Sequence, residues 1–335
     1  MAINKTFGSI FELLQAFPNE KACVRYLENL LWNGTPVSPF DAKSKVYACK
    51  RGRYKCKNTG KYFNVKTRTI FEGSKIGLQK WFMAIYMIVS RKAGISAYTL
   101  AIDLRVTHKT AWFLLHRLRR AMVHESFDLI MKGIIEMDET LIGGRNPNRH
   151  KNKKVKGCQG RSYKDKTPVF GMLERAVYEV KERPHKRNPN KTVKEKILVK
   201  KARVKCFVLH NTTADILDPL ILDNVEKDSK VYTDEYNGYN NVCMNYTHGA
   251  VNHNRGLYAI GEVHSNGIEN FWTNAKNTVR GTYIDIRGKY LQSYFNEFTF
   301  RRNFNTEPVD NKFRYLIESI KGKRLTYKAL TGKAA

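Results

Sequence analysis

The chain has 335 residues, of which 42% are hydrophobic and 12% aromatic, which excludes a disordered basic tail and predicts folded domains. Sixty Lys and Arg residues against thirty Asp and Glu give a formal net charge of +30, and a polyphosphate is the simplest partner for such a surface. The six cysteines form no CxxC pair, and neither a secretory signal nor a bilayer-spanning apolar run is recognisable, so we expect a cytoplasmic protein with reduced thiols and no membrane partner.

The N-terminal part, residues 1–72, reads as two helices followed by a small β-ribbon. Amphipathic spacing predicts helices within 8–32, interrupted at Pro18. Glycines and prolines then separate short runs with strand character, at 45–49, 53–56 and 62–66. We expect these runs to pair as a basic ribbon.

Residues 73–125 are predicted to be helical. An apolar helix covers 77–92, Ser96 can cap a helix that ends at Leu104, and Thr107 can cap another that begins at His108. Two helices across a short turn fit a helix-turn-helix, although an ordinary helical hairpin has the same pattern. In the DNA-binding interpretation, the contacting residues are His108, Lys109, Thr110, Arg117 and Arg120.

From residue 133 onward, strands and helices alternate, which is typical of an α/β fold. We expect strands at 133–140, 167–175, 203–210 and 230–235, with one helix at 212–222 and another from Asn266. Basic insertions near 145–166 and 181–201 read as exposed loops or a β-extension. Residues 306–335 read as a basic C-terminal tail.

Positive charge is concentrated before and after one short acidic stretch. Residues 1–132 and 145–205 carry net charges of +15 and +16, whereas 206–335 carry only +2. Glu136, Asp138 and Glu139 lie between the two basic regions. Charge runs are often only solvated surfaces, but basic regions flanking carboxylates favour contact with DNA or RNA.

Three carboxylates carry the most specific signal. Asp138 and Asp234 end predicted strands, and α/β sheets present ligands at the carboxyl ends of their strands. Glu269 lies in the first turn of the helix that we expect Asn266 to cap. Carboxylates that converge repel one another unless they bind Mg²⁺ or Mn²⁺, and two such ions about 3.5–4 Å apart can catalyse phosphodiester displacement.

Each carboxylate also has a purely structural alternative. Asp138 can simply end a strand, Asp234 can belong to the turn before Gly238, and Glu269 can form a capping box. Lys276 and Arg280 favour the functional interpretation. They lie seven and eleven residues after Glu269, on the same helical face, where they can grip phosphate.

Several motifs resemble bacterial insertion-sequence transposases of the DDE superfamily. They are Asp138-Glu-Thr with Gly143-Gly144, the segment 233–239, and the segment 264–272 followed by Lys276. The likeness is greatest to the subgroup with an N-terminal zinc ribbon and a helix-turn-helix, and it extends over most of residues 20–305.

The resemblance implies an RNase H-like catalytic core over 130–305, in which Asp138, Asp234 and Glu269 hold two Mg²⁺ or Mn²⁺ ions. It also implies hydrolysis at the terminal inverted repeats and strand transfer into target DNA. We expect a homo-oligomer that assembles on DNA. We also expect it in the bacterial cytoplasm, associated with the nucleoid. Two alternatives stay open: a non-catalytic DNA-binding regulator derived from a transposase, and an RNase H-like nuclease.

The ribbon departs from that family in its ligand positions. Where the family usually has four cysteines, this chain has Ser38, Asp41, Cys56 and Thr59. Structural zinc needs about four nitrogen or sulfur ligands, so we expect no structural zinc here. We expect aromatic packing to hold the ribbon instead, by Phe40, Tyr47, Tyr54, Tyr62 and Phe63.

Overall fold

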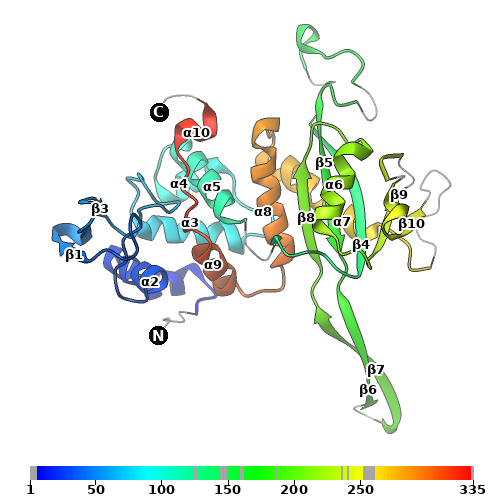
Figure 1. Cartoon of the computed structure of the whole chain (residues 1–335), viewed down its shortest axis with the longest axis horizontal. Helices are drawn as coiled ribbons and strands as arrows, with labels where there is room; N and C mark the ends of the chain where they lie inside the picture. The colour runs from blue at the N-terminus through cyan, green and yellow to red at the C-terminus, as the bar shows by residue number, and fades with distance from the viewer. Residues whose placement is uncertain are drawn as a thin grey trace. The chain divides into compact units, whose positions relative to one another are not determined.

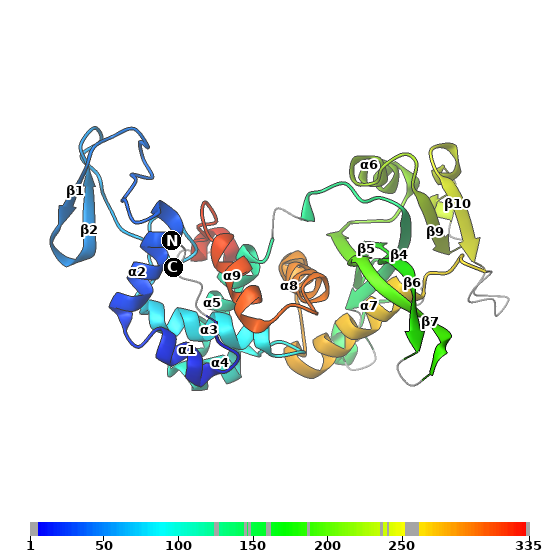
Figure 2. The ribbon, with the colours of Figure 1, turned by 90° about the horizontal axis from the view of Figure 1, so that it is seen from below.

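A computed structural model of the chain describes residues 6–123, 127–143, 146, 149–158, 162–185, 188–234, 237–239, 241–251 and 261–332. It contains two compact units, one formed by Met1–His124 with Phe304–Ala335 and one by Glu125–Asn303. Figures 1 and 2 show the elements of each unit from two directions. Over the described ranges, no helix is both long and apolar enough to cross a bilayer.

The first unit is mainly helical, and polar side chains set where its helices begin. Ser9, Asn19, Ser96 and Thr107 each accept a hydrogen bond from a backbone N–H of the first turn that follows. The two caps predicted from the sequence, Ser96 and Thr107, are therefore confirmed. The helices are α1 (Ile10–Ala16), α2 (Glu20–Trp32), α3 (Leu78–Ser90), α4 (Ala97–Leu104), α5 (His108–Ala121), α9 (Val309–Glu318) and α10 (Tyr327–Thr331).

The C-terminal residues belong to this helical unit and do not form a separate tail, which corrects the interpretation of 306–335. Phe313 of α9 is buried, and its ring lies 5.4 Å from that of Phe82 in α3 and 5.1 Å from that of Phe7. The basic residues had suggested a solvated segment. The apolar stripe of α9 outweighs them because it completes the core around α3.

The predicted ribbon is an antiparallel sheet of β1 (Val46–Cys49), β2 (Arg53–Cys56) and β3 (Tyr62–Phe63). Phe63 packs with Tyr54 and with Trp32 of α2, at ring distances of 5.7 and 5.8 Å. The prediction is wrong for Tyr47 and Tyr62, which are exposed. They are exposed because a ribbon this small has only one face to bury. Each ring lies beside a lysine or arginine side chain.

Hydroxyl groups surround Cys56, the one cysteine at the four ligand positions of the ribbon. Burial raises the pKa of the Cys56 thiol, but hydrogen bonds with Ser38, Ser44 and Thr59 outweigh burial and bring it down to about 6. Ser38 Oγ also accepts hydrogen bonds from the backbone N–H groups of Phe40 and Asp41. The segments around Ser38 and Cys56 are therefore held together by a network of hydrogen bonds that includes the Cys56 thiol.

The second unit is built on a mixed five-stranded sheet in the order β10-β9-β4-β5-β8. β4, β9 and β10 run parallel, while β5 pairs antiparallel with both β4 and β8. All four predicted strands are confirmed, and β10 was not predicted. The strands are β4 (Ile134–Gly143), β5 (Lys166–Glu174), β8 (Arg203–Val208), β9 (Lys230–Asp234) and β10 (Thr247–Val251).

Helices cover both faces of this sheet, as Figure 2 shows. On one face, α6 (Ala214–Asn224) packs on Ile135 and Met137 of β4. On the other face lie α7 (Asn266–Thr278) and α8 (Leu291–Asn303). Because side chains alternate along a strand, Glu136 and Asp138 point to the face that α7 covers.

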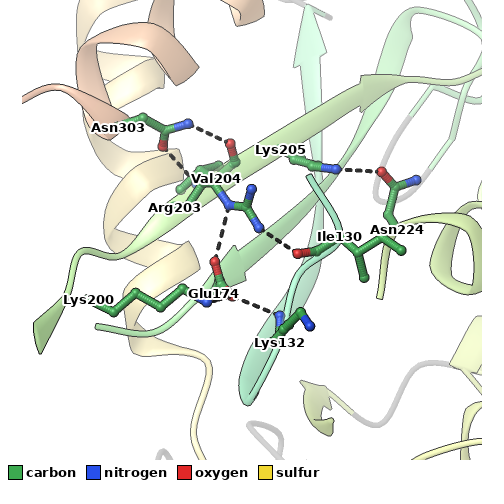
Figure 3. Close-up of polar contacts among 9 residues, drawn as sticks. All are labelled: Ile130, Lys132, Glu174, Lys200, Arg203, Val204, Lys205, Asn224 and Asn303. Atoms are coloured by element: carbon green, nitrogen blue, oxygen red, sulfur yellow. Dashed lines mark hydrogen bonds and ion pairs between the residues drawn. The ribbon is translucent and has the colours of Figure 1, made fainter. Parts of the chain in front are cut away.

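A long hairpin of β6 (Val177–His185) and β7 (Asn188–Lys200) extends away from the sheet, as Figure 1 shows. It confirms the expected β-extension within 181–201. Its root is fixed by Glu174, a buried carboxylate that accepts hydrogen bonds from Lys200 Nζ at 2.5 Å and Arg203 Nε at 3.1 Å (Figure 3). The backbone N–H of Lys132 donates to the same carboxylate, so Glu174 ties the end of β7 and the start of β8 to the segment that leads into β4.

Candidate functional site

Strand register brings Asp138 and Asp234 together. β4 and β9 pair in parallel, and their last pair in register is Glu136 with Tyr232. Asp138 and Asp234 each lie two residues beyond that pair, so they are at the same level on neighbouring strands. The two carboxylates therefore meet where β4 and β9 cease to pair, and the carboxyl ends of parallel strands are where such sheets bind ligands. Asp234 ends β9 as predicted, whereas the prediction that Asp138 ends a strand is wrong, since β4 continues to Gly143 beside β5.

Glu139 joins these two aspartates. Among the described residues, the carboxylate oxygens of Asp138, Glu139 and Asp234 form one group within 4.8 Å of one another. Sequence analysis treated Glu139 only as a neighbour. The side chain of Glu139 starts from the α6 face, where its charge acts on the buried Tyr239. Burial, followed by the charges of Glu139, Asp138 and Asp234, holds the pKa of Tyr239 well above its ordinary value.

The electrostatics of this cluster fit a divalent cation. Burial raises the pKa of Asp138 to about 7, and the negative charges of Asp234 and Glu269 add to the effect. The N–H of Glu139, which donates to Asp138 Oδ1 at 2.8 Å, opposes it only in part. The donor atoms are all carboxylate oxygens, the ligands that Mg²⁺ and Mn²⁺ prefer. A bound cation would offset both the desolvation and the mutual repulsion of these groups.

Glu269 lies in the first turn of α7, near this cluster but outside the group within 4.8 Å. Its Oε1 accepts a hydrogen bond from Ser265 Oγ at 2.7 Å. Ser265 is the N-cap, so the sequence prediction was wrong by one residue when it assigned Asn266. The negative charge of Glu269 nevertheless contributes to the raised pKa of Asp138.

A buried carboxylate of β4 fixes the start of α7. Glu136 is 1% exposed, and its Oε2 accepts a hydrogen bond from the N–H of Ile268 at 2.9 Å. Its Oε1 accepts one from Arg175 Nε at 2.6 Å. Arg175 Nη2 also lies 2.7 Å from His264 Nδ1, so His264 helps to link β5 to the segment that leads into α7.

Sequence analysis missed Glu136 and Arg175 as site residues. The available signal was the alternation of β4: Glu136 lies two residues before Asp138 and therefore on the same face.

A glycine allows α7 to approach the sheet beside Asp138. Gly171 of β5 pairs directly with Asp138. A Cβ atom at this position would lie only 2.5 Å from Cζ2 of Trp272 and 3.0 Å from Cδ1 of Ile268, both on α7. The indole of Trp272 thus occupies the space that any larger residue would need. This close approach sets the height of α7 above the acidic cluster.

Both predicted phosphate-binding residues border hollows in the second unit, Lys276 from α7 and Arg280 from the π-helical turn that follows it. Lys276 lines a hollow of about 220 Å³ together with Glu139, Thr140 and Tyr163. Burial lowers the pKa of Lys276, Asp138 raises it and Arg280 lowers it further. Lys276 is therefore electrostatically coupled to Asp138 on one side and to Arg280 on the other.

The predicted DNA-contacting residues of α5 are only partly accessible. His108 and Lys109 are exposed in its first turn, Thr110 is half-buried, and Arg120 is exposed near its end. Lys109 Nζ lies 4.6 Å from the ring centroid of Tyr327 in α10.

Arg117, which the sequence predicts to contact DNA, is buried in the structure. It is 7% exposed, its guanidinium lies 4.3 Å from the ring centroid of Phe113, and its Nη1 donates to the carbonyl oxygen of Ile70 at 3.1 Å. The second half of α5 is enclosed on several sides, so Arg117 serves the core and not a DNA surface.

Comparisons with known proteins identify the family of the chain. Residues 130–303 match the family model described as ISXO2-like transposase domain. The chain is 25% identical over 319 residues to an uncharacterized protein in transposable element ISH50 of Halobacterium salinarum, covering 91% of this chain and 98% of that protein. It is 29% identical over 123 residues to an uncharacterized transposase-like protein of Haemophilus influenzae, covering 36% of this chain and 97% of that protein. The matched family region contains the acidic cluster and both hollows, and the chain belongs to the ISXO2-like transposases, a family of DDE-type insertion-sequence transposases.

Proposed function

We propose that this protein is a DNA transposase that cuts phosphodiester bonds at the ends of an insertion sequence and joins the freed 3′ ends to target DNA. The observation that carries the proposal is the meeting of Asp138 and Asp234 where the parallel pairing of β4 with β9 ceases, next to the helix that carries Glu269. The sheet order β10-β9-β4-β5-β8, with helices on both faces, supports an RNase H-like core.

In this proposal, Asp138 and Asp234 are the principal ligands of the divalent cations, and Glu269 completes the site. Glu269, whose Oε1 accepts a hydrogen bond from Ser265 Oγ, would hold the cations if its side chain gave up that hydrogen bond. Glu139 would stay beside Tyr239, on the α6 side of the site. Mg²⁺ or Mn²⁺, when bound as a pair, would activate the attacking oxygen and stabilise the leaving one.

The remaining groups position DNA. Lys276 of α7 and Arg280 of the π-helical turn that follows it would bind phosphates next to the cutting site. α4 and α5 would act as a helix-turn-helix, with His108, Lys109 and Thr110 toward the major groove and Arg120 on the backbone. The basic residues of 145–205, including the β6–β7 hairpin, would contact further phosphates. Two element ends must be processed together, so we propose a homo-oligomer assembled on DNA.

The direct test is a reaction of the full chain with Mg²⁺ and duplex DNA that carries the inverted repeats bounding its gene. We expect cutting at the repeat ends, followed by joined products, and loss of both in Asp138→Asn, Asp234→Asn and Glu269→Gln with DNA binding retained. Binding without cutting in the wild type would favour a regulator, and cutting without joining would favour a nuclease. Activity in all three variants would refute the assignment of the site.

A further inference from the structure

A second hollow of about 830 Å³ lies beside the candidate site, between the end of β4 and the turn that follows α7. We call it the basic groove. Four cationic side chains line it: Arg149, Lys276, Arg280 and Arg287. Two carboxylates also line it, and one of them, Asp165, is paired with Arg149 at 2.5 Å. The groove therefore keeps a net positive charge, which suits a phosphodiester chain.

The basic groove is linked to the acidic cluster. Leu141 and Lys276 line both this groove and the smaller hollow that contains Glu139. A strand whose phosphate lies at Asp138 and Asp234 would thus pass Lys276 directly into the groove. The walls there are partly apolar, formed by Leu141, Val279, Ile284 and Ile286. Apolar walls are of no use to a phosphate, but they suit the face of an unstacked base.

Ile284 is the most unusual residue of this wall. Its φ of +62° and ψ of −57° place it at the centre of a γ-turn, closed by the Asp285 N–H donating to the Tyr283 carbonyl oxygen at 2.7 Å. A β-branched residue in this conformation is strained, and strain of this kind is concentrated at functional sites. The side chain is also 64% exposed. The fold thus holds an apolar residue in a costly conformation where it points into solvent.

The preceding residue makes this presentation rigid. The ring of Tyr283 packs edge to face on Tyr294 of α8 at 4.9 Å, and its hydroxyl donates to the buried carboxylate of Glu297. Val279–Tyr283 form a π-helical turn at the end of α7, a feature frequent at functional sites. Ile284 is therefore held by the turn and by α8, although its own side chain contributes little to the core.

We propose that the basic groove receives the DNA strand next to the cut phosphate in an unstacked form, and that Ile284 is the apolar wedge that keeps a base out of the duplex stack. Apolar side chains inserted between base steps are a general means of unstacking DNA. This proposal rests on the proposed strand-cutting function and adds to it how the substrate is opened. In this arrangement the arginines of the basic groove bind the phosphates of the unstacked strand.

Cutting rates on two substrates test the wedge. One substrate is a fully paired duplex with the repeat that bounds the gene, and the other has two mismatched base pairs at the cut position. We expect Ile284→Gly to cut the paired duplex at least tenfold more slowly than the wild type, yet to cut the mismatched duplex within about twofold of it. Glycine accepts the positive φ, so the thermal midpoint of this variant should not fall. Leu222→Ala, which truncates an exposed leucine of α6, is the control and should behave as wild type on both.

Further measurements separate this proposal from the proposed function. In metal-free buffer, 2-aminopurine beside the cut position should brighten on binding of the wild type and not of Ile284→Gly. Equal cutting of the paired duplex by Ile284→Gly and wild type would overturn the wedge. So would an Ile284→Gly rate that is slow on both substrates, since rescue by mismatches is then absent. A wild type that cuts neither substrate would overturn the strand-cutting function itself.

Discussion

Gly171 of β5 and Trp272 of α7 are in such close contact that a methyl group on Gly171 would lie 2.5 Å from the indole. Gly171 pairs with Asp138 across the sheet, and Trp272 lies three residues after Glu269 on α7. The distance between the sheet, which carries Asp138, and α7, which carries Glu269, is therefore possible only because residue 171 has no side chain. Packing at this contact controls the geometry of the whole acidic site.

Gly171→Ala should therefore reduce both stability and activity. We expect it to lower the free energy of unfolding by about 1–3 kcal/mol, the usual cost of overpacking a core. It should also slow metal-dependent cutting, because α7 must move away from β4. Chemical denaturation and a cutting assay measure the two effects. Gly8→Ala is the matched control, since its Cβ meets only Glu12 Oε2 at 3.9 Å, and it should change neither quantity.

Glu136→Gln tests whether the buried carboxylate holds α7. Glu136 pairs with Arg175 and accepts the Ile268 N–H, so the amide leaves the half-buried guanidinium of Arg175 without its counter-charge. We expect a loss of about 3 kcal/mol in unfolding free energy, as for other broken buried ion pairs, together with slower cutting. Glu226→Gln removes an exposed pair with Lys132 and should cost less than about 1 kcal/mol. Equal costs for the two variants would contradict the assigned role of Glu136.

Two arginines of α5 should respond in opposite ways to truncation. Arg117 is buried, and burial lowers its pKa to about 10. Arg117→Ala should therefore destabilise the fold by about 1–3 kcal/mol, because it leaves the Ile70 carbonyl without its donor. Arg120 is exposed, and Arg120→Ala should change stability by less than about 0.5 kcal/mol.

DNA titrations over a range of salt concentrations complete this comparison. Arg120→Ala should weaken binding and reduce the salt slope by about one unit, as expected for the loss of one phosphate contact. Unchanged affinity and slope would remove Arg120 from the proposed DNA surface.

His248 gives a prediction about pH. Burial lowers its pKa, and its Nε2 lies 2.8 Å from Thr233 Oγ1. The unfolded chain therefore binds this proton more readily than the folded chain, so stability is complete above a pH of about 6.5 and falls as the pH drops toward the lowered pKa. In His248→Gln, thermal unfolding between pH 7 and pH 5 should depend less steeply on pH. A slope as steep as that of the wild type would show that other groups account for the dependence.

The sequence was sufficient to predict the central strands of the five-stranded sheet. β4 and β9 begin as apolar runs that lead to Asp138 and Asp234, so the convergence of the two aspartates follows from parallel pairing, although Asp138 lies midway along β4 and not at its end. β10 was not predictable in this way. Thr247–Val251 contains Gly249, where a Cβ would lie 2.9 Å from Val263, and its strand conformation depends on that tertiary contact.

Other features depend on packing that no local pattern contains. Glu139 enters the acidic cluster although it starts from the opposite face of β4 to Asp138, and the alternation of side chains along a strand does not predict this. Arg117 looked like part of a basic helix face, but the end of α5 is buried on consecutive positions, which helical periodicity does not predict. Glu136 was visible as a charged residue in an apolar strand. Its role in holding the start of α7 depends on the hydrogen bond from the Ile268 N–H, which the sequence does not predict.

The most direct test of the central claim is to locate a bound Mn²⁺ ion by its anomalous scattering in crystals of the full chain. The account predicts a peak within coordination distance of the carboxylates of Asp138 and Asp234, and no such peak in crystals of Asp138→Asn. A peak elsewhere, or a peak that persists at this position in Asp138→Asn, would contradict it.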